Sequence, residues 1–337
     1  MVQIFTVAQP LLPGENEPSG LLWRTSELEA SAAIDRVLIG YSPAWPHNHA
    51  CAPYMLAATA KLSLIVAHRP GVMEPAAAAR YFATLDVISG GRLAVSLDLG
   101  DTGSELPHED SYLGDIPRYQ RAAQHLDVMR HTWAIQDASR RDTAPGGEDP
   151  GSPLPGQLPI YMSGDSQAAV DLGARYADTY MLWGEPLAAM RQRIGAVSAA
   201  ARRYGRSLRF AVGLRLFLGD TDEDAWAQAR EAEWLLTMHR DSPLIRRFAT
   251  GDAPGARLRQ LALASEELHD DCLWTRLVTV LGGLSSSVAL VGTPERVLTS
   301  LRSYRDLGVS AFLCTTGPFG VWEPQLEDFL LRVKREL

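Results

Sequence analysis

Cysteine is scarce in this sequence. The 337 residues contain three, Cys51, Cys272 and Cys314, at wide separations. An odd number of widely spaced cysteines argues against a disulfide framework and a CxxC type of metal site, so reduced thiols are expected. No run of 18 apolar residues occurs, and the first ten residues have no basic segment ahead of an apolar stretch. A membrane span and a secretion signal are therefore not expected, and a soluble cytoplasmic protein is.

Positive charge is also in deficit. Lysine and arginine number 32 against 40 aspartates and glutamates, a formal net charge of −8, and no block of like charges stands out. This balance gives no electrostatic support to binding of nucleic acid or an anionic membrane. Apolar residues make up 46% of the chain and charged residues 21%, which is ordinary for a globular protein. The length suits one large domain over residues 1–337, with insertions.

Short apolar runs recur along the chain, and many are followed by an amphipathic stretch of helical period. This alternation is typical of parallel strands joined by crossover helices. Eight such runs predict an α/β fold, a (β/α)8 TIM barrel with insertions. The expected strands are Ile4–Ala8, Arg36–Gly40, Ser63–Ala67, Leu93–Leu97, Pro159–Met162, Thr179–Leu182, Phe210–Leu218 and Ala311–Cys314.

Local signals mark the ends of several helices. Pro75 favours a first helical turn, and Gly90 follows the last residue, Ser89. Ser166 and Thr221 are placed to cap two more helices, the second with acidic residues behind it. Further helices are expected at about 118–135, 186–204, 294–307 and 323–336.

Two stretches interrupt the pattern. Residues 137–158 combine proline, glycine, serine and charge with almost no apolar content, which predicts a mobile surface loop. Residues 222–281 are too long for a simple crossover and predict a helical insertion packed over one barrel end.

The turn Ser163-Gly164-Asp165-Ser166 joins an expected strand to an expected helix. Active sites of such barrels lie at the carboxyl ends of the strands, so this turn is a candidate. Free N–H groups at a helix start favour a bound phosphate. The alternative is that Asp165 or Ser166 only caps the helix.

Three histidines also follow apolar runs. His47 and His49 could share one side of an extended segment and suggest a metal, but no further ligands with a recognisable spacing are present, so no metal is expected. Exposed or hydrogen-bonding loop histidines, or contact with a substrate, are the alternatives. His68 lies at a strand end, where it is either a structural residue or a functional one.

Arg215 interrupts an apolar strand. Period-two alternation puts it on one face with Gly213 and Phe217 and opposite Leu214 and Leu216. A charge in a central strand is costly unless it is paired or faces a wet cavity. Arg215 is therefore either half of a structural ion pair or part of a site that binds an anion.

Several motifs together carry a resemblance to a family. Residues 69–80, RPGVMEPAAAAR, and 83–92, ATLDVISGGR, resemble the signature of the FMNH2-dependent alkanesulfonate monooxygenases of the bacterial luciferase group. Residues 180–186, YMLWGEP, are similar to its Trp-Gly-Glu-Pro segment, and 289–292, ALVG, to a late turn. The order and spacing match over most of the chain.

The resemblance implies a luciferase-like barrel enzyme that uses O2 and reduced FMN, supplied by a separate flavin reductase. In such an enzyme the flavin does the oxygen chemistry, and the protein holds it and excludes water. The implied cofactor contacts are Ser163, Gly164, Asp165, Ser166, Arg118 and Tyr119 at the phosphate, and Ala67, Ser96 and Trp183 at the ring. Arg215 and His68 are the expected catalytic residues.

Departures from the family pattern change the expected substrate. Asp165 replaces a small polar residue, and a carboxylate near a phosphate is repulsive by about 1–4 kcal/mol. Several cationic or proton-transferring positions of the family are lost as well. A larger or more apolar organic substrate than a simple alkanesulfonate is therefore expected. Its expected contacts are Trp45, His47, Phe217 and Phe319.

Two other readings remain open. Similar barrels also carry deazaflavin-dependent hydride transfer. A non-catalytic relative could keep the barrel and lose flavin binding, or serve as a partner subunit, which Asp165 would explain. Self-association as a homodimer or homotetramer is expected from the resemblance.

Overall fold

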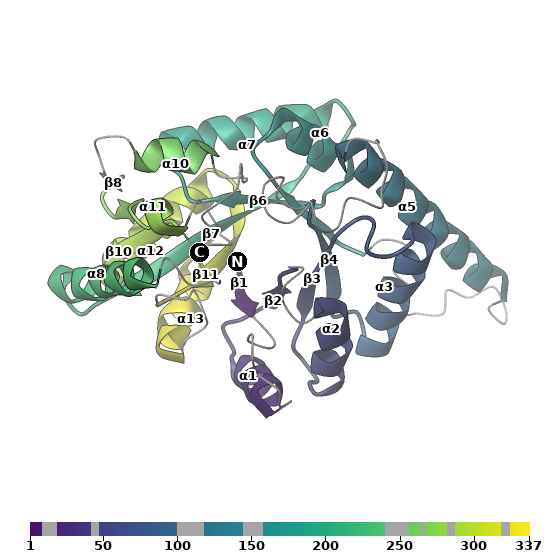
Figure 1. Cartoon of the computed structure of the whole chain (residues 1–337), viewed down its shortest axis with the longest axis horizontal. Helices are drawn as coiled ribbons and strands as arrows, with labels where there is room; N and C mark the ends of the chain where they lie inside the picture. Colours follow the sequence, from purple (N-terminus) through teal and green to yellow (C-terminus); the bar gives the residue numbers. More distant parts are fainter. Residues whose placement is uncertain are drawn as a thin grey trace.

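The last long strand closes the sheet on itself. The computed structural model describes residues 1–8, 19–41, 47–99, 118–143, 158–239, 256–263, 267–281, 287–317 and 324–337. Its barrel strands are β1 (Gln3–Ala8), β2 (Arg36–Ile39), β3 (Leu64–His68), β4 (Leu93–Leu97), β5 (Ile160–Ser163), β6 (Thr179–Trp183), β7 (Arg209–Leu218) and β11 (Val309–Thr315). Each pairs in parallel with the next, and β11 pairs with both β1 and β7 (Figure 1). The predicted (β/α)8 barrel is confirmed.

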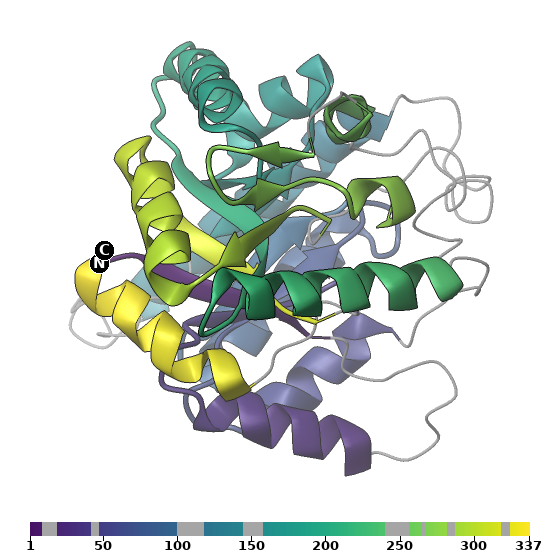
Figure 2. The ribbon, with the colours of Figure 1, turned by 90° about the vertical axis from the view of Figure 1, so that its left-hand side faces the viewer.

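Helices surround the barrel. Those predicted from Pro75 and Ser166 begin at these residues, whereas the first two helices of the chain were not predicted. They are α1 (Ser19–Ala30), α2 (Asn48–Ala57), α3 (Pro75–Ser89), α5 (Arg118–Thr143), α6 (Gln167–Tyr176), α7 (Leu187–Arg202), α12 (Pro294–Asp306) and α13 (Glu327–Glu336), the last after the short 3-10 helix η3 (Pro324–Leu326). Helix α3 begins with its proline and ends at Gly90 in the left-handed conformation, with φ of 73°. Figures 1 and 2 show the chain termini side by side. None of the described helices has both the length and the apolarity needed to cross a membrane.

Helix α5 is longer than the composition indicates. A loop was expected from residue 137, but the helix continues to Thr143. Arginine and alanine favour helix even when the segment is polar, and the first strong breakers are Pro145 and Gly146. Residues 144–157 of the expected loop lie outside the described part of the chain.

The expected insertion is not purely helical. It contains α8 (Asp222–Met238), α10 (Ala256–Ala262) and α11 (Val278–Leu281), and also a hairpin of β8 (Leu268–His269) and β9 (Leu273–Trp274). Asp270 and Asp271 make the tight turn of this hairpin with φ of 45° and 76°, a region that aspartate tolerates better than most residues.

A further strand was expected only as a turn. It is β10 (Ala289–Gly292), which pairs in parallel with the carboxyl half of β7 and antiparallel with β9. The insertion thus continues the sheet away from the barrel, and Figure 2 shows α8 in dark green across this side.

Apolar side chains fill the barrel lumen below its carboxyl end. Phe5 and Tyr161 meet edge to face with ring centroids 5.9 Å apart. The other members of this layer are Ile65, Ala94, Met181, Ala211, Ala311 and Leu313. The described part of the barrel is therefore a packed core rather than a pore at this level, and the active sites of this fold lie above such a layer, at the carboxyl ends of the strands.

Candidate functional site

A further set of strand positions lines the lumen above the apolar layer. Alternate residues of a strand face one side, so the residues two positions after the layer also face the lumen. This places Ala67 beside Ser96, and Trp183 beside Gly213. It also places Ser163 at the end of β5, and the predicted ring contacts Ala67, Ser96 and Trp183 on one continuous wall.

The turn after β5 is built around a glycine. Gly164 has φ of +138°, and a Cβ there would lie 2.6 Å from the Cβ of Ala169. Ser166 caps α6 by accepting a hydrogen bond from the Ala169 N–H at 3.1 Å, as predicted. The remaining N–H groups of the first helical turn have no partner within a helix and face outward from its positive end. The turn therefore has the form of an anion site.

Helix α5 brings two more polar side chains to this turn. The Tyr119 hydroxyl lies 3.0 Å from Ser166 Oγ, and the Arg118 guanidinium lies 5.2 Å from the Tyr119 ring centroid. Both residues were predicted beside the phosphate turn. The structure brings Tyr119, with the adjacent Arg118 over its ring, to Ser166, which is distant in sequence.

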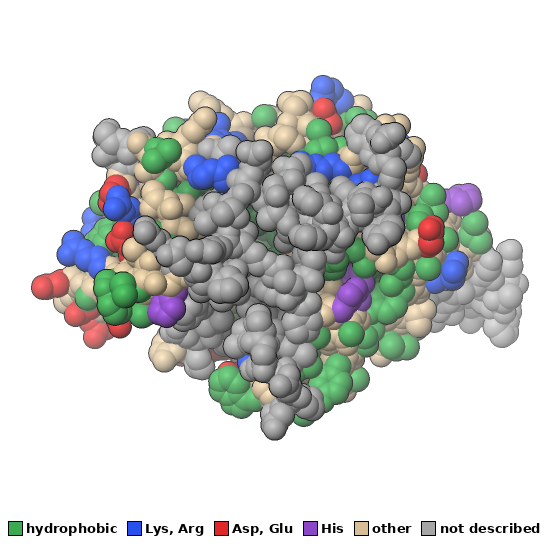
Figure 3. Space-filling model, viewed as in Figure 1, with side chains coloured by type: hydrophobic (Ala, Val, Ile, Leu, Met, Phe, Trp, Pro, Cys, Tyr) green, Lys and Arg blue, Asp and Glu red, His purple; other side chains and the backbone are tan. Residues whose placement is uncertain are grey.

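Asp165 is paired with an arginine. Arg193 on α7 places Nη2 2.7 Å from Asp165 Oδ1 and Nη1 3.1 Å from Glu185 Oε1. Burial lowers the pKa of the Arg193 guanidinium, but the charges of Asp165 and Glu185 outweigh it and raise that pKa above its usual value. The acid that argued against a phosphate is thus neutralised locally. On the face shown in Figure 3, basic side chains (blue) lie along the α6, α7 and α10 side.

Arg215 lies on the lumen face of β7 next to Thr315 of β11. Its side chain is 1% exposed, and Nη1 donates a hydrogen bond to the Gly317 carbonyl oxygen. Burial lowers the pKa of Arg215 to about 9, so the charge remains at neutral pH. Thr315 Oγ1 is buried and has no hydrogen-bond partner. A buried hydroxyl without a partner beside a buried cation is an arrangement suited to an oxygen atom of a ligand.

The structure does not bring His68 to the lumen. As the residue after Ala67, it faces outward, and it packs under α2, α3 and α5 with no exposed surface. Its Nε2 lies 2.9 Å from His125 Nε2, and its ring lies 5.3 Å from that of His49. Direct contact with a substrate in the lumen is therefore not supported for His68.

His47, predicted to contact substrate, is exposed and lies at the outer end of this row of imidazoles, 5.0 Å from the His49 ring. Among the described residues, no group of three or more His, Cys, Asp or Glu side chains is arranged to hold a metal ion.

Phe217 also lies away from the lumen residues. It is 2% exposed and packs against Trp274, with ring centroids 6.4 Å apart, in a core shared with α8 and β10. The pairing of β11 with β7 ends at Arg215, and β7 continues beside β10, so Phe217 lies past the closed part of the barrel and packs with the insertion. The other predicted substrate contacts, Trp45 and Phe319, lie outside the described residues.

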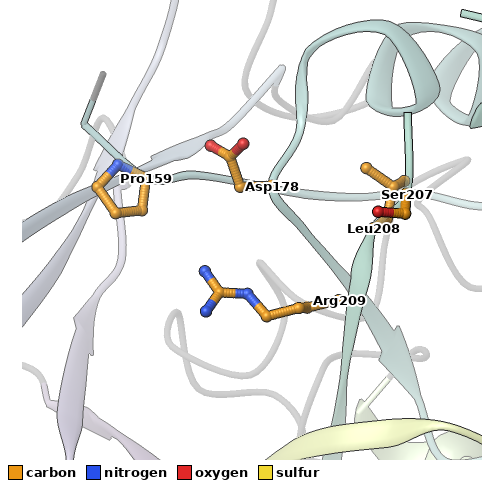
Figure 4. A pocket seen from close by; sticks show the side chains of 5 residues that line it. All are labelled: Pro159, Asp178, Ser207, Leu208 and Arg209. Atoms are coloured by element: carbon orange, nitrogen blue, oxygen red, sulfur yellow. The ribbon is translucent and has the colours of Figure 1, made fainter. Parts of the chain in front are cut away.

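One cavity lies at the opposite end of the barrel. It has a volume of about 330 Å³ and is lined by Pro159, Asp178, Ser207, Leu208 and Arg209 (Figure 4). These residues precede or begin strands, whereas active sites of this fold follow them. The cavity is therefore unrelated to the turn at Ser163.

The sequence alone did not single out Arg193. It falls in a stretch recognised only as helical, where periodicity predicts which apolar residues are buried but not which arginine reaches a neighbouring turn. His125 was missed for the same reason. The Tyr180 hydroxyl, which donates to the Gly164 carbonyl at 2.9 Å, belonged to a motif quoted only for its resemblance.

Known protein structures share this fold. Riboflavin lyase, solved with modified FMN and riboflavin, superposes with a TM-score of 0.70 at 17% identity, covering 99% of this chain and 91% of that chain. The oxygenating constituent of 3,6-diketocamphane monooxygenase from Pseudomonas putida, solved with FMN, gives 0.67 at 15% identity over 100% and 97%. A coenzyme F420-dependent secondary alcohol dehydrogenase gives 0.62 at 16% identity over 98% and 97%.

At these identities the superpositions establish the shared fold and no more. The model of the luciferase-like monooxygenase family matches residues 24–311, which is most of the chain. These residues include the turn at Ser163–Ser166, the lumen wall and Arg215. This protein belongs to the luciferase-like monooxygenase family.

Proposed function

We propose that this protein is a monooxygenase that uses reduced FMN and O2 to oxidise an organic small molecule. One observation carries the proposal: a helix start with a required glycine, a capping serine and a neutralised acid opens beside a lumen wall that ends in a buried arginine. The first half of this arrangement suits a phosphate, and the second half suits an oxygen-bearing reactant.

The residues present fit FMN. Its phosphate would be held by Ser166, Tyr119, Arg118 and the first N–H groups of α6. Its ring would lie against Ala67, Ser96 and Trp183, which share one face of the barrel wall. Reduced FMN, when bound, supplies the electrons for activation of O2, and a separate flavin reductase would provide it.

The chain's own side chains would shield and orient the reactants. The layer around Phe5 and Tyr161 closes the lumen from below and excludes water from that side. The Arg215 guanidinium and the Thr315 hydroxyl would hold an oxygen atom of the substrate by charge-assisted and neutral hydrogen bonds. The loss of several cationic or proton-transferring positions of the alkanesulfonate monooxygenases favours an organic substrate other than a simple alkanesulfonate.

Deazaflavin-dependent hydride transfer is the second candidate, and the fold shared with the F420-dependent alcohol dehydrogenase favours it. Titration of intrinsic tryptophan fluorescence under anaerobic conditions separates the two. We expect reduced FMN to quench the emission with a micromolar Kd and deazaflavin to bind at least about tenfold more weakly. Tight deazaflavin binding without FMN binding would contradict the monooxygenase proposal and favour deazaflavin-dependent hydride transfer. Binding of neither would indicate a non-catalytic relative.

Replacing Gly164 with alanine is expected to destabilise the protein by about 1–3 kcal/mol, because the left-handed φ and the contact with Ala169 both oppose a Cβ. The distorted turn should also weaken FMN binding about tenfold. Thermal unfolding and fluorescence titration measure both effects.

Gly195→Ala on α7 is the matched control. A Cβ there meets nothing within 4 Å, so we expect unchanged FMN affinity and a slightly more stable helix. Equal behaviour of the two variants would contradict the role given to Gly164.

A further inference from the structure

Asp165, in the turn at Ser163–Ser166, is the first of four side chains of alternating charge that contact one another in a row. Asp165 contacts Arg193, Arg193 contacts Glu185, and the second oxygen of Glu185 lies 2.8 Å from Nε of Arg257 on α10. Two cations and two carboxylates sum to zero net charge. These four side chains therefore add no net charge at the proposed cofactor site, although the one nearest to it, Asp165, is a carboxylate.

Three of these four charged side chains are largely buried, so the balance of their charges affects the site. The Glu185 side chain is 4% exposed, that of Arg193 is 13% exposed and that of Asp165 is 19% exposed. Asp165 Oδ2 is also buried without a hydrogen-bond partner. Water screens these three charges poorly, so removing Asp165 or Arg193 leaves a charge that acts on neighbouring groups and on any bound anion.

Arg193 also touches the backbone of the turn. Its Nη2 donates to the Gly164 carbonyl oxygen at 3.2 Å, the same oxygen that accepts from Tyr180. These two donors anchor the Gly164 carbonyl oxygen from α7 and β6. One guanidinium thus fixes the shape of the turn and cancels its acid.

We propose that Arg193 is the positioning residue that allows an acidic turn to hold the cofactor phosphate, and that Asp165 limits how tightly the phosphate is held. This inference rests on the proposed function. With Arg193 in place the phosphate meets a neutral pair. Without Asp165 it would meet an excess positive charge, and without Arg193 a bare carboxylate. A weakly held flavin suits an enzyme that receives reduced FMN from another protein and releases it after turnover.

A double-mutant cycle on FMN binding tests this inference. Asp165→Asn is expected to lower the Kd for FMN about tenfold, and Arg193→Gln to raise it about tenfold. The double variant should return to within about threefold of wild type, because the two charges are removed together. Riboflavin, which lacks the phosphate, is the matched ligand, and its Kd should change less than about twofold in every variant.

Arg257→Gln is the matched control variant, because Arg257 contacts the same Glu185 from the far side and its side chain is 47% exposed. We expect its Kd for FMN to stay within about twofold of wild type. A double variant that binds as weakly as Arg193→Gln would overturn the counter-ion role, and so would equal shifts for FMN and riboflavin.

The two proposals fail in different ways. If wild type and Asp165→Asn bind FMN with equal Kd, this inference fails and the proposed function stands. If neither binds FMN at millimolar concentration, both fail.

Discussion

Replacing Arg215 with methionine is expected to lower kcat/KM for the native substrate by about 100- to 1000-fold. The lost group is the cation that lies on the lumen face of β7 beside the unpartnered Thr315 hydroxyl. Methionine keeps much of the side-chain volume and removes the cost of burying a charge, so we expect the melting temperature to stay within a few degrees. The Kd for FMN should also be nearly unchanged, because the turn proposed to hold the phosphate follows β5 and not β7.

Arg209→Ala is the control for this prediction. Arg209 begins the same strand but is exposed at the opposite end of the barrel, beside the cavity of Figure 4. Its loss should leave turnover unchanged. Steady-state kinetics coupled to a flavin reductase measure both variants. Full activity of Arg215→Met would remove Arg215 from the mechanism and reduce it to a structural residue.

Acid is expected to destabilise the protein between about pH 6.5 and pH 4 through the buried histidines. Burial lowers the pKa of His49 and of His125 from 6.5 to about 4. As the pH falls through 6.5, these histidines become protonated in the unfolded chain, whereas in the folded chain they stay neutral until about pH 4. Stability is therefore fully present above pH 6.5 and falls as the pH drops, by on the order of 3 kcal/mol for each histidine.

Urea unfolding at pH 7.5 and pH 4.5 measures this loss. His125→Gln should flatten the pH dependence, at some cost in stability at pH 7.5 because its contact with His68 is lost. His131→Gln is the matched control: His131 is exposed on the same helix, so the pH dependence should match wild type. A pH dependence that is the same in wild type and His125→Gln would contradict the assignment.

Strand and helix positions could be predicted closely because they depend on local signals. Alternation located the barrel strands, and Pro75, Gly90, Ser166 and Thr221 marked helix ends that the structure confirms. The errors arose where pairing is non-local. Strand β10 looked like a turn because its partners on β7 and β9 are distant in sequence or hidden in an insertion.

The backbone conformation of the candidate site could be predicted from the sequence, but the pairing of its charged side chains could not. The form of the turn at Ser163–Ser166 follows from glycine, serine and a helix start, all of which are local. The neutralisation of Asp165 could not be predicted, because its partner Arg193 lies on the next helix. His68 shows the opposite error: its place at a strand end suggested the lumen, but the period-two alternation of β3 sends it outward, beside His125.

The central claim is that the helix start at Ser166 binds the flavin phosphate. A crystal structure with FMN tests it most directly. We predict phosphate oxygens within hydrogen-bond distance of Ser166 Oγ, the Tyr119 hydroxyl and the first N–H groups of α6, with the isoalloxazine ring against Ala67 and Trp183. A flavin bound elsewhere, or a turn left empty at saturating FMN, would contradict the claim.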